Sequence, residues 1–193
     1  MKKFIQNLIA LLIFLTISAI YFSPVIGPGA KVLSAHDVDT WKGMSKEVCD
    51  HRDNTGEEAL WTKRMFSGMP AYQISTKSNG NLLQYIDKAL QLGLPRPMNL
   101  LFLYLIGFYI LLLTLKIDYR LSIVGAIGFA FSSYFLIIIQ AGHMTKAHSI
   151  AYIPLIVASV LYVFNNNKLI LGAVFTSLFV GLQLYSNHYQ ITY

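Results

Sequence analysis

The chain has 193 residues, of which 55% are hydrophobic and only 12% are charged, with a formal net charge of +6. Soluble globular domains carry about 25% charged residues, so this composition excludes an ordinary soluble domain and indicates a membrane protein. Nine of the fifteen basic residues lie between positions 31 and 96, mixed with eight acidic ones and with no basic, aromatic-rich stripe. The charge therefore argues against nucleic-acid binding and for contact with anionic lipid headgroups. The single cysteine, Cys49, excludes an internal disulfide and a multi-cysteine zinc site.

The first apolar segment covers residues 4–22 and follows Lys2 and Lys3. About 20 apolar residues are needed to cross a bilayer, and this run is longer than the apolar part of a cleavable signal peptide, which has about 7–15 residues. No clean small-x-small cleavage site follows it. We therefore expect residues 1–22 to form an uncleaved signal anchor with its N-terminus in the cytoplasm.

Residues 23–97 are predicted to form a long extracytoplasmic loop with short helices. The loop opens with Pro and Gly residues that do not sustain a helix. A helix is expected to begin near Trp41 and to end near Arg52. A second helix is expected within residues 82–94, because Leu83, Ile86 and Leu90 recur at helical spacing, and it should lie along the membrane surface.

Four further spans are predicted at residues 98–115, 121–140, 147–164 and 169–186. The fourth of the five spans reaches full length only if Lys146 and His148 join its first turn, and Pro154 should weaken or kink it. The short loops around Lys116 and Lys168 are basic and should face the cytoplasm, as the positive-inside rule requires. The chain ends directly after a span, so we expect it to be the N-terminal part of a longer, truncated protein. The expected fold class is an all-α polytopic membrane protein.

Three polar clusters fall at the outer ends of these spans, at residues 36–39, 142–148 and 187–190. Apolar helices need none of these side chains. Their convergence predicts a site at the outer membrane surface.

Asp37 and Asp39 are candidate acids of this site. Carboxylates at i and i+2 share a face of a strand but point in different directions on a helix. One of them, Asp39 above all, could instead cap the helix expected near Trp41. Asp37 has no such local role, and it could serve as a general base or hold a divalent cation.

The second cluster contains His143, Lys146 and His148. His143 and Lys146 are three residues apart and can share a helical face, whereas His148 does not fit a paired metal-ligand spacing. Binding of a lipid phosphate therefore fits this cluster better than a metal site does. The alternative for Lys146 is ordinary snorkelling of its ammonium group to the interface.

The third cluster centres on His188, with Asn187 and Gln190 beside it. The neighbouring tyrosines could form only an aromatic belt at the interface. His188 adds hydrogen-bonding capacity that a belt does not need, so it is also a candidate substrate-binding residue.

Several motifs together resemble the bacterial YfhO-type membrane proteins, in order and over nearly the whole chain. They are residues 37–44 (DVDTWKGM), 56–62 (GEEALWT), 65–73 (MFSGMPAYQ), 142–154 (GHMTKAHSIAYIP) and 187–193 (NHYQITY). That family is similar to the GT-C superfamily of polytopic glycosyltransferases, which transfer a sugar from a polyprenyl-phosphate carrier to an acceptor on the outer face of the membrane.

The resemblance implies a GT-C-like fold in the bacterial inner membrane and a cell-envelope acceptor. It implies that Asp37 is the catalytic base or a metal ligand, and that His143 and Lys146 neutralise the departing phosphate. Trp41 is then a candidate surface on which the sugar stacks, whereas Trp61 is more readily an interfacial anchor. Two other functions remain open: a transporter or flippase-like module that binds lipid-linked substrates without catalysis, and a structural membrane subunit.

Overall fold

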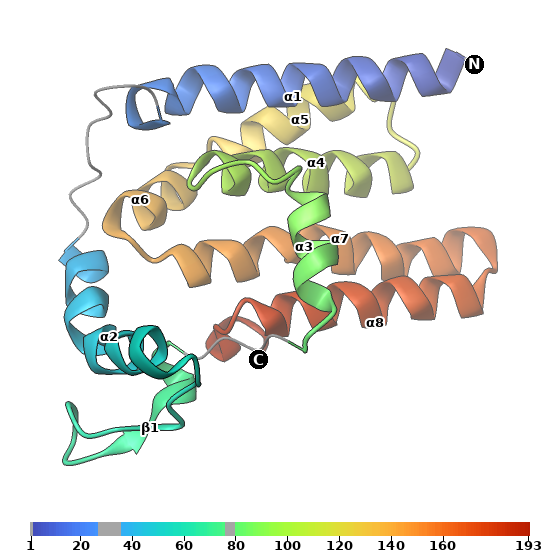
Figure 1. Ribbon diagram of the computed structural model, residues 1–193. Helices are drawn as coiled ribbons and strands as arrows, with labels where there is room; N and C mark the ends of the chain where they lie inside the picture. Colours follow the sequence, from blue (N-terminus) through green and yellow to red (C-terminus); the bar gives the residue numbers. More distant parts are fainter. Residues whose placement is uncertain (1, 27–35, 76–79) are drawn as a thin grey trace.

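The computed structural model describes residues 2–26, 36–75 and 80–193, and this part of the chain is mostly helical (Figure 1). The helices are α1 (Lys2–Ile26), α2 (His36–Thr55), α3 (Leu83–Leu90), α4 (Met98–Thr114), α5 (Tyr119–Ala130), α6 (Ser133–Ala141), α7 (Met144–Asn166) and α8 (Leu169–Tyr185). Two short strands, β1 (Trp61–Thr62) and β2 (Met69–Pro70), pair antiparallel. Two short 3-10 helices are also present: η1 (Ala71–Gln73) after β2, and η2 (Tyr189–Ile191) after α8.

The long helices α1, α4, α7 and α8 run along a common direction and form a bundle, with α5 behind them (Figure 1). The N-terminus and the turns that follow α4 and α7 lie at one end of the bundle. The other end, on the left in Figure 1, carries α2, the β1–β2 hairpin, the turn between α6 and α7 and the end of α8. The long helices therefore alternate in direction along the chain, as the sequence predicted. This alternation brings the three polar clusters to one end of the bundle, which we call the outer end.

Helix α4 is the centre of the bundle. Every residue in its first two turns, from Met98 to Leu105, is buried. A helix that is apolar on all sides requires cover on all sides, and α1, α5 and α7 provide it. At Gly107 the backbones come close, because a Cβ atom there would lie 3.2 Å from the carbonyl oxygen of Ala151 on α7.

In the part of the chain that the structure describes, two helices are long and apolar enough to cross a membrane, α1 over Lys3–Ile26 and α7 over Met144–Asn166. The pair α5 and α6 counts as a third candidate if the two helices are taken as one bent span. Helices α4 and α8 are apolar but have only 17 residues each. These candidate spans indicate a membrane protein.

The structure differs from the expected spans in two places. The helix expected to run without a break over residues 121–140 is interrupted, because α5 and α6 meet at an angle of 45°. Ser132, between them, is extended with ψ 132°, so the helical backbone is interrupted at this residue. Helix α1 also runs on through Pro24 to Ile26, beyond the boundary expected at residue 22.

Helix α7 begins at Met144, so Lys146 and His148 lie in its first turns. This is what a span of full length was expected to need. The helix continues without interruption through Pro154, although a weak point was expected there.

The close packing of α7 and α8 depends on Gly172. A Cβ atom at this position would lie 2.1 Å from Val163 Cγ2 and 3.3 Å from the carbonyl oxygen of Ser159. We expect Gly172→Leu to separate the two helices and to lower the free energy of unfolding by about 1–3 kcal/mol, as overpacking does. Thermal unfolding in detergent, followed by circular dichroism, measures this effect. The matched control is Gly128→Leu on α5, where a Cβ atom meets nothing within 4 Å; equal losses in the two variants would contradict this account of the interface.

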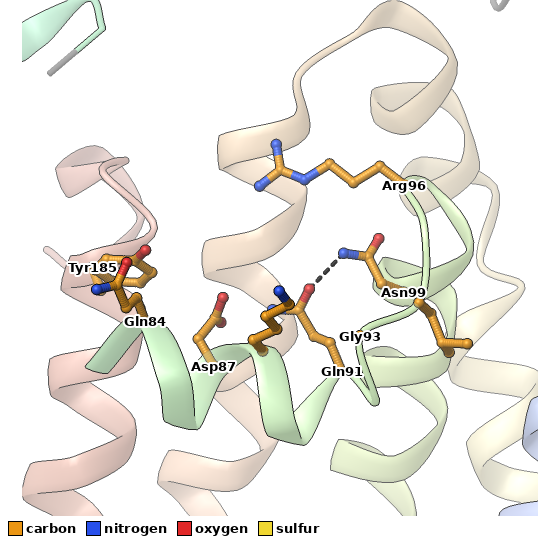
Figure 2. A pocket seen from close by; sticks show the side chains of 9 residues that line it. Gln84, Asp87, Gln91, Gly93, Arg96, Asn99 and Tyr185 are labelled. Atoms are coloured by element: carbon orange, nitrogen blue, oxygen red, sulfur yellow. Dashed lines mark hydrogen bonds between the residues drawn. The ribbon is translucent and has the colours of Figure 1, made fainter. Parts of the chain in front are cut away.

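Helix α3 crosses over α7 and α8 (Figure 1). A buried polar network joins it to the bundle (Figure 2). Asp87 Oδ1 lies 2.7 Å from His148 Nε2 and also accepts a hydrogen bond from the hydroxyl of Tyr152. Gln91 accepts a hydrogen bond from Asn99 on α4. One short helix thereby connects α4 and α7.

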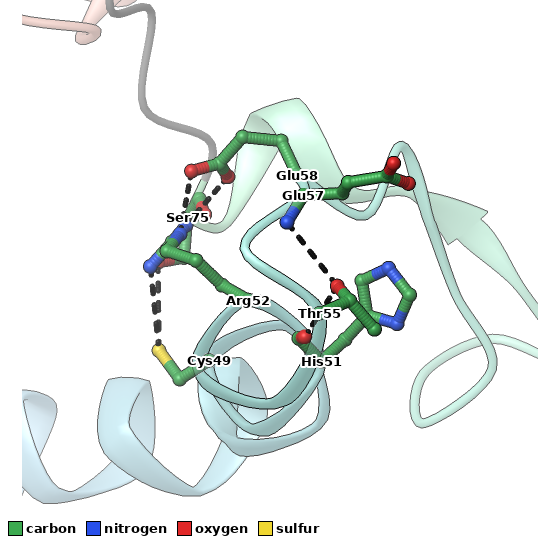
Figure 3. Close-up of polar contacts among 7 residues, drawn as sticks. All are labelled: Cys49, His51, Arg52, Thr55, Glu57, Glu58 and Ser75. Carbon is green, nitrogen blue, oxygen red and sulfur yellow. Dashed lines mark hydrogen bonds and ion pairs between the residues drawn. The ribbon is translucent and has the colours of Figure 1, made fainter.

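Residues 56–75, which follow α2, fold back onto it. Arg52 donates to both carboxylate oxygens of Glu58 and to the carbonyl oxygen of Ser75 (Figure 3). Such bidentate arginine–carboxylate pairs are among the stronger polar contacts. Glu47 on α2 accepts from the Thr62 hydroxyl at 2.8 Å, which holds β1 in place. These contacts hold the segment that follows α2, including β1, against this helix.

Candidate site at the outer end of the bundle

Helix α2 begins earlier than expected, at His36 and not near Trp41. Asp37 and Asp39 therefore lie inside its first turn, where carboxylates interact favourably with the positive end of the helix dipole. The expectation that Asp39 caps a later helix is wrong; Asp39 is exposed and pairs with Lys42 at 3.3 Å. At this spacing on a helix the two carboxylates point in different directions, and Asp37 points to α7.

Asp37 meets His143 across the outer end of the bundle. The distance from His143 Nδ1 to Asp37 Oδ2 is 2.9 Å, and each side chain is about half exposed. The position of His143 depends on Gly142, which ends α6 with φ 93° and lets the chain reverse into α7. This left-handed conformation favours glycine. The contact joins two of the three polar clusters of the sequence.

Lys146 lies one turn after His143, at the start of α7, and is partly buried. Its ammonium group is 5.5 Å from the centre of the Tyr134 ring, which is within the range of a cation–π contact. This contact holds the lysine at the outer end of α7.

His188 also lies at the outer end of the bundle. It is placed between α8 and η2, and η2 contacts α7. Burial lowers the pKa of His188, and the positive charges of Lys146 and His143 lower it further. The third polar cluster therefore comes within electrostatic reach of the second. We call Asp37, His143, Lys146 and His188 the outer cluster.

His148 does not belong to the outer cluster. It is 3% exposed and contacts Asp87 and Gln91 beneath α3. The physical reason is the spacing, since five residues along a helix turn a side chain well away from His143. The structure thus gives His148 a place in the core network and not beside a ligand at the surface.

Asp87 is a polar residue that sequence reasoning missed. The signal was present, because Asp87 comes four residues after Leu83 and three before Leu90 and so shares their apolar face. A carboxylate on such a face requires a buried partner. Burial opposes ionisation of Asp87, but hydrogen bonds from His148, Tyr152 and Gln91 hold its pKa below the usual range.

Trp41 lies one turn after Asp37 on α2 and is 44% exposed. Its indole N–H donates to the carbonyl oxygen of Ile74 at 2.9 Å, so it fastens the segment that follows the hairpin. Trp61 is 56% exposed and packs against Gly68, where a Cβ atom would lie 2.7 Å from the indole nitrogen. Both tryptophans have structural contacts, and only Trp41 is near the outer cluster.

The charges of the outer cluster suit an anion better than a cation. One carboxylate faces a lysine and two histidines, whereas divalent cations such as calcium prefer several oxygen ligands. Within residues 2–26, 36–75 and 80–193, no group of three or more His, Cys, Asp or Glu side chains has an arrangement that could hold a metal ion.

No protein-family model, no curated protein and no solved structure matches this chain, so the resemblance to YfhO-type proteins remains a prediction.

Proposed function

We propose that the chain is part of a membrane glycosyltransferase that takes a sugar from a polyprenyl-phosphate donor and passes it to a cell-envelope acceptor. The observation that carries the proposal is the 2.9 Å contact between Asp37 and His143, with Lys146 and His188 nearby. A carboxylate beside cationic groups at the end of a hydrophobic bundle is what such a reaction requires.

In the proposed reaction the acceptor hydroxyl attacks the anomeric carbon of the donor sugar. Asp37 takes the hydroxyl proton, since its contact with His143 uses only one of its two oxygens. The bond between the anomeric carbon and the phosphate oxygen breaks, and polyprenyl phosphate leaves with the additional negative charge. Lys146, His143 and His188 stabilise that charge.

The proposal places all five apolar segments across the bacterial inner membrane, with the N-terminus in the cytoplasm. Helices α4 and α8 have 17 residues each, which gives a length of about 25 Å. A hydrocarbon core of about 30 Å accommodates such helices by local thinning. Lys116 and Lys168, at the end opposite the outer cluster, then face the cytoplasm.

Donor binding should depend on pH through His188. In the free protein, burial and the charges of Lys146 and His143 lower the pKa of this histidine. A bound phosphodiester anion raises that pKa, so the protein takes up a proton when the donor binds. Affinity should therefore increase as the pH falls from about 8 to 5, by up to about tenfold for each pKa unit that the ligand adds. The phosphodiester itself does not titrate in this range, and Asp37, His143 and Lys146 are the other charged groups that face the ligand.

Titration of a polyprenyl-phosphate sugar into the purified protein measures this binding. His188→Gln should flatten the pH dependence, and Lys146→Gln should weaken binding by about tenfold, as expected for loss of one charge-assisted hydrogen bond. Lys42→Gln is the matched control, because Lys42 is an exposed lysine of α2 that pairs with Asp39. Binding that is unchanged in Lys146→Gln would count against a phosphate site at the outer cluster.

A further inference from the structure

A second polar site lies beneath α3. A cavity of about 350 Å³ is bounded by α3, the loop that leads into α4, and the end of α8. Its walls carry Asp87, Lys88, Gln91, Arg96, Asn99 and Tyr185. None of the four residues of the outer cluster lines it. Figure 2 shows Asp87, Gln91 and Asn99 along one side of the cavity, and Arg96 extending across the opposite side.

The hydrogen bonds around this cavity have a fixed direction. The ionised Asp87 can only accept, so His148, Tyr152 and the amide nitrogen of Gln91 act as donors toward it. The oxygen of Gln91 then accepts from the amide nitrogen of Asn99. The amide oxygen of Asn99 is left at the end of this chain of hydrogen bonds.

That oxygen is buried and has no hydrogen-bond partner. The whole side chain of Asn99 is only 5% exposed. Buried polar groups are nearly always satisfied, because leaving one unsatisfied costs its desolvation free energy. An unsatisfied acceptor on a residue that lines a cavity calls for a donor supplied from the cavity, such as a hydroxyl group.

The cavity also presents unpaired positive charge. Lys88 and Arg96 are exposed at its rim, and among the described residues neither takes part in an ion pair. The one acidic side chain in the lining, Asp87, is already engaged by three donors. A guanidinium group and an ammonium group that line one cavity are the usual partners of a phosphate.

We propose that this cavity binds the phosphate ester of a polyol, with Arg96 and Lys88 on the phosphate and the oxygen of Asn99 accepting from a hydroxyl. Its volume lies within the range of sites for small ligands, about 300–1,000 Å³. The ligand is either the headgroup of a lipid such as phosphatidylglycerol or a free sugar phosphate, since both carry this chemistry. The site is separate from the outer cluster and does not depend on sugar transfer.

The experiment uses the purified chain in nanodiscs and two pairs of probes. The soluble pair is glucose 1-phosphate and ethyl phosphate, and the lipid pair is phosphatidylglycerol and phosphatidylethanol; the second member of each pair keeps the charge but lacks hydroxyls. Calorimetry reports binding of the soluble probes, and native mass spectrometry reports retained lipid. Binding of glucose 1-phosphate alone assigns a free ligand, and retention of phosphatidylglycerol alone assigns a headgroup.

We expect one hydroxylated probe to bind at least about tenfold more tightly than its hydroxyl-free partner, and Arg96→Gln to weaken that binding by at least about tenfold. Lys63→Gln makes the same change in net charge at an exposed position outside the cavity and should bind as the wild type does. Asp37→Asn should also bind normally, which separates this site from the proposed transferase. The proposal is overturned if neither hydroxylated probe binds, if the hydroxyl-free probes bind equally well, or if Arg96→Gln has no effect.

Discussion

Asp87→Leu should lower the free energy of unfolding by about 3–5 kcal/mol, because it removes the acceptor that His148, Tyr152 and Gln91 share. His148 is 3% exposed and Tyr152 is fully buried. The same carboxylate joins α3 to α7. The expected result is a large drop in the thermal unfolding midpoint in detergent, together with faster proteolysis around α3.

Two controls make this test specific. Asp87→Asn keeps an acceptor oxygen and should lose less stability than Asp87→Leu does. Asp50→Asn removes an exposed carboxylate that pairs with Lys46, and it should change stability by no more than about 0.5 kcal/mol. Equal behaviour of Asp87→Leu and Asp50→Asn would contradict the assigned role of the network.

The same network predicts the response to acid. The pKa of Asp87 is lower in the folded protein than in the unfolded chain, where it is about 3.9. Its contribution to stability is therefore fully present above that value and is lost as the pH falls through the folded-state pKa. Wild type should lose stability in this acid range more steeply than Asp87→Asn does, which pH-dependent unfolding measures.

Asp37→Asn should lower the rate of sugar transfer by about 10²–10⁴-fold, the usual contribution of a general base. The amide keeps the size of the side chain but cannot take up a proton at neutral pH. Membrane insertion should be unaffected, because Asp37 is about half exposed at the start of α2. Donor binding should remain within a few fold, since Lys146 and His188 are unchanged.

Asp39→Asn is the matched control for this rate. It makes the same chemical change two residues away, at an exposed carboxylate that pairs with exposed Lys42. Transfer should proceed at nearly the wild-type rate. Similar rates for Asp37→Asn and wild type would show that Asp37 is not the general base.

The sequence predicted the meeting of distant polar clusters because that meeting depends only on the alternation of apolar segments. Asp37 and His143 are far apart in the chain, yet each follows an odd number of the predicted apolar segments, so they lie at the same end of the bundle. His188 follows by the same rule. Such a prediction needs only hydropathy and chain order.

The details inside the bundle could not be predicted in the same way. The bend between α5 and α6 depends on backbone geometry at Ser132, within an apolar run that reads as continuous. The position of α3 depends on partners contributed by α7, and the partner of a carboxylate on an apolar face is not specified by α3 itself. Helix α2 begins at His36, so Asp37 and Asp39 lie in its first turn, whereas the sequence placed them before a helix that starts near Trp41.

The most direct measurement of the central claim follows a polyprenyl-phosphate donor with a radiolabelled sugar in membranes that contain the wild-type protein at its full natural length. The account predicts that the label leaves the lipid carrier and appears in an envelope acceptor, with release of polyprenyl phosphate. A donor that binds at the outer cluster but stays intact would contradict the proposed transfer, and it would favour a protein that binds or moves lipid-linked substrates without reacting with them.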